Sequence, residues 1–347
     1  MRRLAVIVLL VLVAASGAWT LAWYVAGQRL IDAVDRWADA RRHEGWQVAH
    51  DAPTLAGFPG KVAVELGNPA ITAPLPHGGT WSWRAPRMQV EIVPWRWHRI
   101  VLRDSGANAL SLASDAVRFD ATLDCVAAMV RLEGGKSEPA SPDGSQYVVE
   151  LTKPTLRVAA PVVTAEASTI ALTLELHHPP PGDHLAVAAD LDVGVDDLVT
   201  QVLGKASGLP VTANLRAELM GALPPGPLEP AVAAWRDDGG TLEVRRLALR
   251  SSGIMMVTNG TIALDNQMRP MGAATAMIGG YGEALDRLAA AGTVAPRDVQ
   301  LAKLLLAAIA TSNSEGERVL NVPITAQDGW LYVGPVRLTR LEPLKLR

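Results

Sequence analysis

The stretch Val117-Arg118-Phe119-Asp120-Ala121-Thr122-Leu123-Asp124 shows the pattern that dominates the chain. Apolar and polar side chains alternate along it, which is typical of a β-strand with one face in a core and the other in water. The alternation recurs at Ile170 to Leu176, Leu185 to Val195, Leu242/Val244, Leu247/Leu249, Ile262/Leu264, Leu320/Val322/Ile324 and Leu331/Val333. Most of the chain beyond residue 46 is therefore predicted to form strands.

Turn signals separate these strands. They are Pro179-Pro180-Pro181-Gly182, Asp237-Asp238-Gly239-Gly240, Asn259-Gly260 and Asp328-Gly329. Many antiparallel strands, each with one solvent-exposed face, form a long twisted sheet or an open barrel. We predict a mainly β (α+β) fold of this kind, with a few short helices after one N-terminal transmembrane helix.

Three short segments carry a helical period instead. Asp196 to Lys205 is compatible with one helix, and Tyr281 to Ala291 and Arg297 to Ala310 form a stronger pair. Gly292 is expected to end the first helix of that pair, and Pro296 to begin the second.

The N-terminus carries an uncharged apolar run from Leu4 to Gly27, preceded by Arg2 and Arg3. As a helix these 24 residues span about 36 Å, enough for a hydrocarbon core of about 30 Å. The alternative is a signal peptide cleaved after the small residues Ser16-Gly17-Ala18. The run continues for nine residues past Ala18, which favours an uncleaved signal anchor.

Orientation follows from the arginines at the two ends of this run. Arg2 and Arg3 favour a cytoplasmic N-terminus, whereas Arg29, Arg36, Arg41 and Arg42 follow the span. A signal anchor carries its positive charges at a short N-terminus, before the apolar span. We therefore predict a single-pass inner-membrane protein with a cytoplasmic N-terminus and a periplasmic main domain.

The helical period continues from Gln28 to His43, with Leu30, Ile31, Val34, Trp37 and Ala38 on one stripe. This stripe either packs onto the domain, which we favour, or lies on the membrane surface. The predicted organisation is an anchor with a helical extension over residues 1–45 and a β-rich domain over residues 46–347. A Pro-rich stretch at residues 224–230 marks a further boundary candidate.

Composition narrows the classes of partner. The net charge of the 347-residue chain is only −3, so no basic surface for nucleic acid is expected. The single cysteine, Cys125, excludes an intramolecular disulfide and a multi-cysteine metal site. Ten tryptophans against two phenylalanines and four tyrosines make tryptophan the main aromatic residue.

Several local motifs occur in a characteristic order along residues 5–340. They are Gly57-Phe58-Pro59, Trp81-Ser82-Trp83-Arg84-Ala85-Pro86-Arg87, Val93-Pro94-Trp95, Gly260 to Asp265, Arg269-Pro270, Gly279-Gly280-Tyr281, Val322-Pro323-Ile324 and Gln327 to Pro335. With these the chain resembles the Gram-negative envelope family catalogued as domain of unknown function 2125. The resemblance implies an N-terminally anchored envelope protein with a β-rich domain, and no activity. The C-terminal unit of the chain is also similar to the C-terminal unit of AsmA-type envelope proteins, whose elongated sheets form apolar grooves for lipid.

Paired tryptophans provide the candidate site. Trp81 and Trp83 share a face of one predicted strand, and Trp95 and Trp97 are paired likewise. If Ala85-Pro86-Arg87 is a turn, Met88 to Val93 pairs back on the strand that carries Trp81 and Trp83. These four tryptophans line a lipid or partner groove in the functional interpretation, with Arg84, Arg87, Arg96 and Arg99 at its rim. Ordinary core and edge packing is the alternative.

No motif supports catalysis, a metal or a cofactor. His177-His178 with Asp183 and His184 lies in a Pro-rich turn without a partner motif, and the aspartates at positions 190, 192, 196 and 197 lack the glycine and glutamate of a calcium loop. Nucleophile elbows, phosphate loops and dinucleotide fingerprints do not occur in the sequence.

We therefore expect a non-enzymatic envelope protein, with the membrane as its first partner. One hypothesis is that it binds lipid or another hydrophobic ligand in a β-sheet groove. The alternative is an interaction scaffold that recruits other envelope proteins and binds no small ligand. A hydrolase is disfavoured because no motif with a mechanism is present.

Overall fold

The structure is a computed structural model. It describes residues 2–75, 79–93, 95–113, 118–133, 145–158, 163–177, 183–202, 205–206, 209–224, 227–290, 296–312, 316 and 318–344. This part of the chain is mainly β, with 22 strands, a few short helices and one long apolar N-terminal helix, as predicted. The chain divides into two compact units. Unit 1 comprises Met1–Gly134, Val149–Ala165 and Val202–Gly204, and unit 2 comprises Gly135–Val148, Glu166–Gln201 and Lys205–Arg347.

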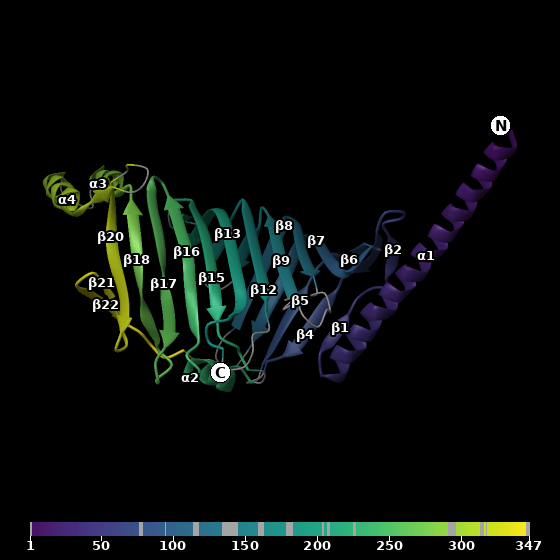
Figure 1. Ribbon diagram of the computed structural model, residues 1–347, viewed down its shortest axis with the longest axis horizontal. Helices are drawn as coiled ribbons and strands as arrows, with labels where there is room; N and C mark the ends of the chain where they lie inside the picture. Colours follow the sequence, from purple (N-terminus) through teal and green to yellow (C-terminus); the bar gives the residue numbers. More distant parts are fainter. Residues whose placement is uncertain are drawn as a thin grey trace. The chain divides into compact units, whose positions relative to one another are not determined.

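Unit 1 combines the long helix α1 (Arg2–His43) with short and long strands (Figure 1). The strands are β1 (Gln47–Ala49), β2 (Thr54–Ala56), β3 (Val62–Gly67), β4 (Ala70–Pro74), β5 (Thr80–Arg84), β6 (Arg87–Val93), β7 (Arg96–Ala113), β8 (Arg118–Glu133) and β10 (Thr155–Val158). Two further strands, β9 (Ser145–Thr152) and β11 (Val163–Glu166), contain residues of both units, and the last residue of β13 (Val187–Val202) also belongs to unit 1.

Strand β7 divides the sheet of unit 1 into two arms. Its first half pairs with β6, which continues to β3 and β2, and its second half pairs with β5, which continues to β4 and β1. The position at which β7 changes its partner from β6 to β5 lies beside a register shift between Asp104 and Gly106 in the pairing of β7 with β8. The predicted pairing of Met88 to Val93 with the Trp81/Trp83 strand is therefore wrong. Both segments pair with β7, because β7 is long enough to hold them one after the other.

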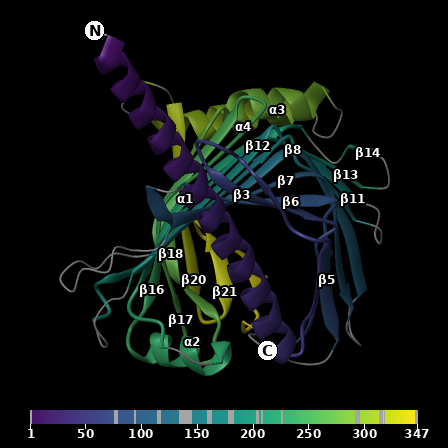
Figure 2. The ribbon, with the colours of Figure 1, turned by 90° about the vertical axis from the view of Figure 1, so that its right-hand side faces the viewer.

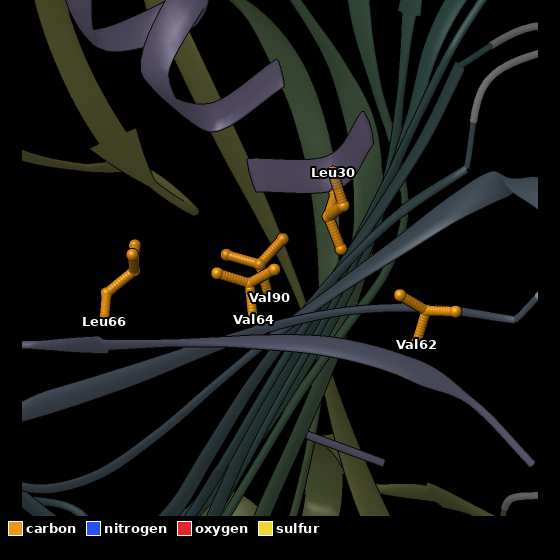
Figure 3. Close-up of a cluster of buried hydrophobic side chains, with 5 residues drawn as sticks. All are labelled: Leu30, Val62, Val64, Leu66 and Val90. Carbon is orange, nitrogen blue, oxygen red and sulfur yellow. The ribbon is translucent and has the colours of Figure 1, made fainter. Parts of the chain in front are cut away.

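Helix α1 lies against β1 and β3 and closes the space between the two arms (Figure 2). The core of the unit is a cluster of five buried residues, Leu30, Val62, Val64, Leu66 and Val90. Leu30 faces the strands that carry Val64 and Val90 (Figure 3). The stripe predicted on Gln28 to His43 thus packs onto the β-rich part, and the helix runs without a break from Arg2 to His43. Burial of these aliphatic side chains stabilises the contact by about 1.5–3 kcal/mol for each one.

Unit 2 contains one antiparallel sheet and three short helices. The strands are β12 (Thr169–Leu176), β13 (Val187–Val202), β14 (Lys205–Ala206), β15 (Val211–Met220), β16 (Thr241–Ser251), β17 (Ile254–Leu264), β18 (Pro270–Gly279), β19 (Thr311–Ser312), β20 (Arg318–Gln327), β21 (Trp330–Val333) and β22 (Val336–Arg340). The helices are α2 (Leu228–Asp237), α3 (Tyr281–Ala290) and α4 (Pro296–Ile309). The last two confirm the predicted helix pair.

Register places apolar side chains in rows across the sheet of unit 2. Leu172 pairs with Val193, which pairs with Leu215, which in turn pairs with Leu247. Direct partners in a sheet point to the same face, so these four side chains form one apolar row. All four are only half-buried, whereas polar residues such as Asp192 and Arg216 point to the opposite face and pair with each other at 3.1 Å. The predicted alternation is confirmed for these strands.

Two local predictions in unit 2 are wrong. Residues 196–202 continue strand β13 instead of forming a helix. A register shift between Val195 and Leu198, with Asp197 at φ +53°, interrupts the alternation and produces the spacing that resembles a helix.

Asn259-Gly260 lies inside β17 and is not a turn. A Cβ on Gly260 would lie 2.4 Å from the carbonyl oxygen of Ala273 on β18, so glycine is required here by close strand approach. The Asp237–Gly240 and Asp328-Gly329 turns are confirmed, since α2 ends at Asp237 and β21 follows Gly329. The stretch Pro179–Gly182 lies outside the described residues.

Candidate functional site

An apolar cavity of about 460 Å³ lies within unit 1, between α1 and the two arms of the sheet. One wall is the helix stripe of Leu30, Ala33, Val34, Trp37 and Ala38, whose spacing puts all five on one face of α1. The opposite walls come from both arms and from the strands that join them. They consist of Val48, Ala49, His50, Leu66, Pro69, Ala70, Ile71, Trp83, Met88, Val90, Ile100, Leu102 and Leu132. The cavity therefore exists because β7 separates the arms and α1 closes them.

The mouth of the cavity lies beside Ala33 and Trp37. Both residues line the cavity, yet Ala33 is exposed and Trp37 keeps 46% of its surface accessible. Leu30 and Ala38, one turn to either side, are buried. A volume of this size and an apolar lining are typical of sites for small hydrophobic ligands.

Of the four tryptophans predicted to form a groove, Trp83 lines the cavity. Its indole Nε1 donates a 2.9 Å hydrogen bond to Oδ1 of the buried Asn108 on β7. The Asn108 amide donates in turn to the Asp104 carboxylate and to the carbonyl oxygen of Gly106, at the register shift where the arms separate. The bond ties the Trp83 ring to β7 beside the register shift.

Trp81 and Trp95 are not in the lining of this cavity. Trp81 makes an edge-to-face contact with Trp46, with ring centroids 5.8 Å apart. Trp95 is 66% exposed, and the side chain of Trp97 lies outside the described part of the structure. Trp81 and Trp83 are both on β5, as expected. The described lining of the cavity contains Trp83 and none of Arg84, Arg87, Arg96 and Arg99, so the groove of four tryptophans with an arginine rim stays a prediction.

Among the described residues that line this cavity, His50 is the one with an ionisable side chain. Its Nδ1 lies 2.9 Å from the carbonyl oxygen of Asp51, a geometry in which a proton on Nδ1 is donated to that oxygen. Nε2 then carries a lone pair and is buried without a hydrogen-bond partner in the described part of the chain. The carboxylate of Asp35 is 3.9 Å away, beyond hydrogen-bonding distance. A hydroxyl or amide N–H on a ligand would satisfy this nitrogen.

The helix wall is held in place by the segment before β3. The indole nitrogens of Trp19 and Trp23 donate hydrogen bonds of 3.0 and 2.7 Å to the carbonyl oxygens of Pro59 and Lys61. Trp23 also makes an edge-to-face contact with Phe58, with ring centroids 5.4 Å apart. No sequence motif predicted this contact between the helix and the segment before β3.

Beside the wall, β3 and β6 bury a charged group. Glu91 is buried and pairs with Lys61 at 2.5 Å and with Arg103 at 3.2 Å. Two cations around one carboxylate compensate the loss of its hydration. This arrangement is a structural ion pair on the arm that carries the cavity wall.

A family model described as "Uncharacterized protein conserved in bacteria (DUF2125)" matches residues 23–342. The chain belongs to the DUF2125 family. The match covers nearly the whole chain and begins at Trp23, the residue that ties α1 to the segment before β3. The resemblance seen in the sequence is thus confirmed. Neither the curated proteins nor the solved structures gave a match to this chain.

The DUF2125 motifs near the C-terminus build turns in unit 2. Oδ1 of Asp265 accepts hydrogen bonds from the backbone amides of Gln267 and Arg269, and Oδ2 pairs with the Arg269 guanidinium at 2.6 Å. Burial acts to raise the pKa of Asp265, but the hydrogen bonds from Arg269 and Gln267 prevail and lower it. These motif residues order the β17–β18 connection, so their role in this DUF2125 protein is structural.

Proposed function

We propose that this protein is a non-enzymatic, membrane-anchored envelope protein that binds one hydrophobic ligand in the cavity beneath α1. The cavity carries the proposal, since its walls are apolar except for His50 and the tryptophan ring edges. An acyl chain bearing a hydroxyl or amide group matches both the apolar walls and the unpartnered Nε2 of His50.

The anchor is the N-terminal part of α1. It is the helix in the described part of the chain that is long and apolar enough to cross a bilayer. Its residues from Leu9 to Ala22 are exposed, and in Figure 1 this end of α1 projects beyond the strands of its own unit. In our proposal the helix is an uncleaved signal anchor in the inner membrane, with Arg2 and Arg3 in the cytoplasm and the β-rich part in the periplasm.

The test is native mass spectrometry of the full chain, purified from membranes in mild detergent. We expect one lipid-sized adduct for each chain. Because surrounding bilayer lipid also co-purifies, a cavity-blocking variant is needed. Ala33→Phe places a ring at the mouth of the cavity and is expected to reduce the bound fraction. Ala40→Phe makes the same change on an exposed position of α1 that does not line the cavity, and should leave the adduct intact.

Two results would contradict the ligand proposal. One is a wild-type chain without an adduct, and the other is an adduct that Ala33→Phe and Ala40→Phe affect equally. An empty chain that crosslinks in cells to a discrete set of envelope proteins would instead support the scaffold function.

A further inference from the structure

The segment from Gly57 to Lys61 is fixed to the membrane-proximal half of α1. Trp19 and Trp23 donate their indole protons to the Pro59 and Lys61 carbonyls, and the Trp23 ring contacts Phe58. One turn further along, a Cβ on Gly27 would lie 2.7 Å from the Leu55 side chain, so helix and strand β2 approach closely. These contacts determine at which level of the helix the segment lies.

Helix geometry relates that level to the bilayer. A span that starts at Leu4 crosses a hydrocarbon core of about 30 Å after about 20 residues, which is at about Trp23. Trp19 and Trp23 are then at the boundary between acyl chains and headgroups, where indole rings prefer to lie. A segment bonded to both indoles is at the same boundary.

The segment has the chemistry that this environment requires. Phe58 is 52% exposed although it is a large apolar side chain. The amide of Lys61 donates to the carbonyl oxygen of Gly57 at 3.1 Å, and Pro59 has no amide proton. Together with the two indole bonds, this leaves the carbonyls of Gly57, Pro59 and Lys61 satisfied without water. Backbone groups paired in this way avoid much of the cost of a low-dielectric environment.

We propose that the Gly57–Lys61 segment is a second membrane contact, which inserts Phe58 among the lipids of the leaflet on the domain side. This inference rests on the proposed anchor and goes beyond it, because it assigns the β-rich part its own contact with lipid. The cavity begins at Leu30, about 10 Å along the helix from Trp23. The contact therefore holds the cavity next to the leaflet from which an acyl chain would enter.

The experiment places an environment-sensitive fluorophore on single cysteines of the full chain, reconstituted in phosphatidylethanolamine–phosphatidylglycerol vesicles that contain nitroxide lipids. Gly60→Cys is the test position, because an added Cβ there meets nothing within 4 Å. Leu10→Cys reports on the anchor, and Ala40→Cys is an exposed position about 25 Å along the helix from Trp23. The wild-type chain, whose one cysteine is buried, gives the background labelling.

We expect the label at residue 60 to lose fluorescence to nitroxide lipids and to shift to the blue, like the label at residue 10. The label at residue 40 should respond to aqueous iodide instead. Quenching at residue 10 together with an iodide-sensitive label at residue 60 would overturn the membrane contact and leave the anchor intact. Lack of lipid quenching at residue 10 would overturn the anchor, and with it this inference.

Discussion

Trp23 and Lys61 lie 38 positions apart, and the indole of the first donates a 2.7 Å hydrogen bond to the carbonyl oxygen of the second. The bond is partly buried and joins α1 to the start of β3. It occurs where the anchor leaves the proposed bilayer and the β-rich part begins. The anchor and the sheet of unit 1 are therefore joined by tertiary contacts as well as by the chain.

Trp23→Phe should lower the free energy of unfolding of unit 1 by about 1–2 kcal/mol, since the Lys61 carbonyl loses its donor while the aromatic contact with Phe58 is kept. Thermal unfolding of the full chain in detergent, followed by circular dichroism of the strands, measures this. Trp19→Phe is the matched control and should cost less, because the bond from Trp19 is exposed. Equal losses for the two variants would argue against a specific role of the Trp23 bond.

Gly27→Val should destabilise the same unit by about 1–3 kcal/mol, because its branched side chain overlaps Leu55. Gly27→Ala should be nearly neutral. The alanine gains up to about 1 kcal/mol of helix propensity, and the flexible end of Leu55 moves aside. The same unfolding measurement applies, with Gly17→Val as control, since nothing lies within 4 Å of a Cβ at Gly17. A loss as large at Gly17 as at Gly27 would contradict close packing as the cause.

Trp83→Phe should cost about 1–3 kcal/mol, because the buried Oδ1 of Asn108 loses its donor. Trp95→Phe is the control, as the same change at a 66% exposed ring should alter stability little. Denaturant unfolding of the full chain in detergent measures the loss of stability in each of the two variants. Equal losses for the two variants would argue against the buried bond to Asn108 as the cause.

Asp265→Asn tests the pH dependence of unit 2. The pKa of Asp265 is lowered from its ordinary value of 3.8, so the carboxylate stabilises the folded state above that pH. This contribution is lost as the pH falls from 3.8 through the lower folded-state pKa. At pH 7 the variant should be less stable by about 1–3 kcal/mol, and the difference should shrink toward about pH 2. Asp192→Asn, in an exposed pair with Arg216, should change stability by less than about 1 kcal/mol.

Much of the fold follows from local pattern. The alternation around Phe119 and along Ile170 to Leu176 predicts the strands because each strand has one face in water. The stripe from Leu30 to Ala38 predicts the helix face that forms the cavity wall. Pairing was predicted less well, because the Ala85-Pro86-Arg87 turn is local information. The strands on either side of it both pair with β7, one before and one after its register shift between Asp104 and Gly106.

The candidate site could be predicted only in part for the same reason. Trp83 was identified from its spacing to Trp81, but its role depends on Asn108, which is 25 residues away. His50 and Ala33 carry no motif, and they share a cavity only because α1 closes the space between two arms of the sheet. Sequence spacing reports on faces of single elements and gives no distance between elements that pack together.

The unbroken course of α1 would couple the cavity to bilayer thickness if its N-terminal part is the proposed anchor. A spanning helix adjusts to a thinner or thicker hydrocarbon layer mainly by tilting. Here the same helix continues from the span into the cavity wall at Leu30 to Ala38 without a hinge residue at which the tilt would be absorbed. With α1 as the proposed anchor, a change of tilt caused by hydrophobic mismatch would reach the helix residues that line the cavity.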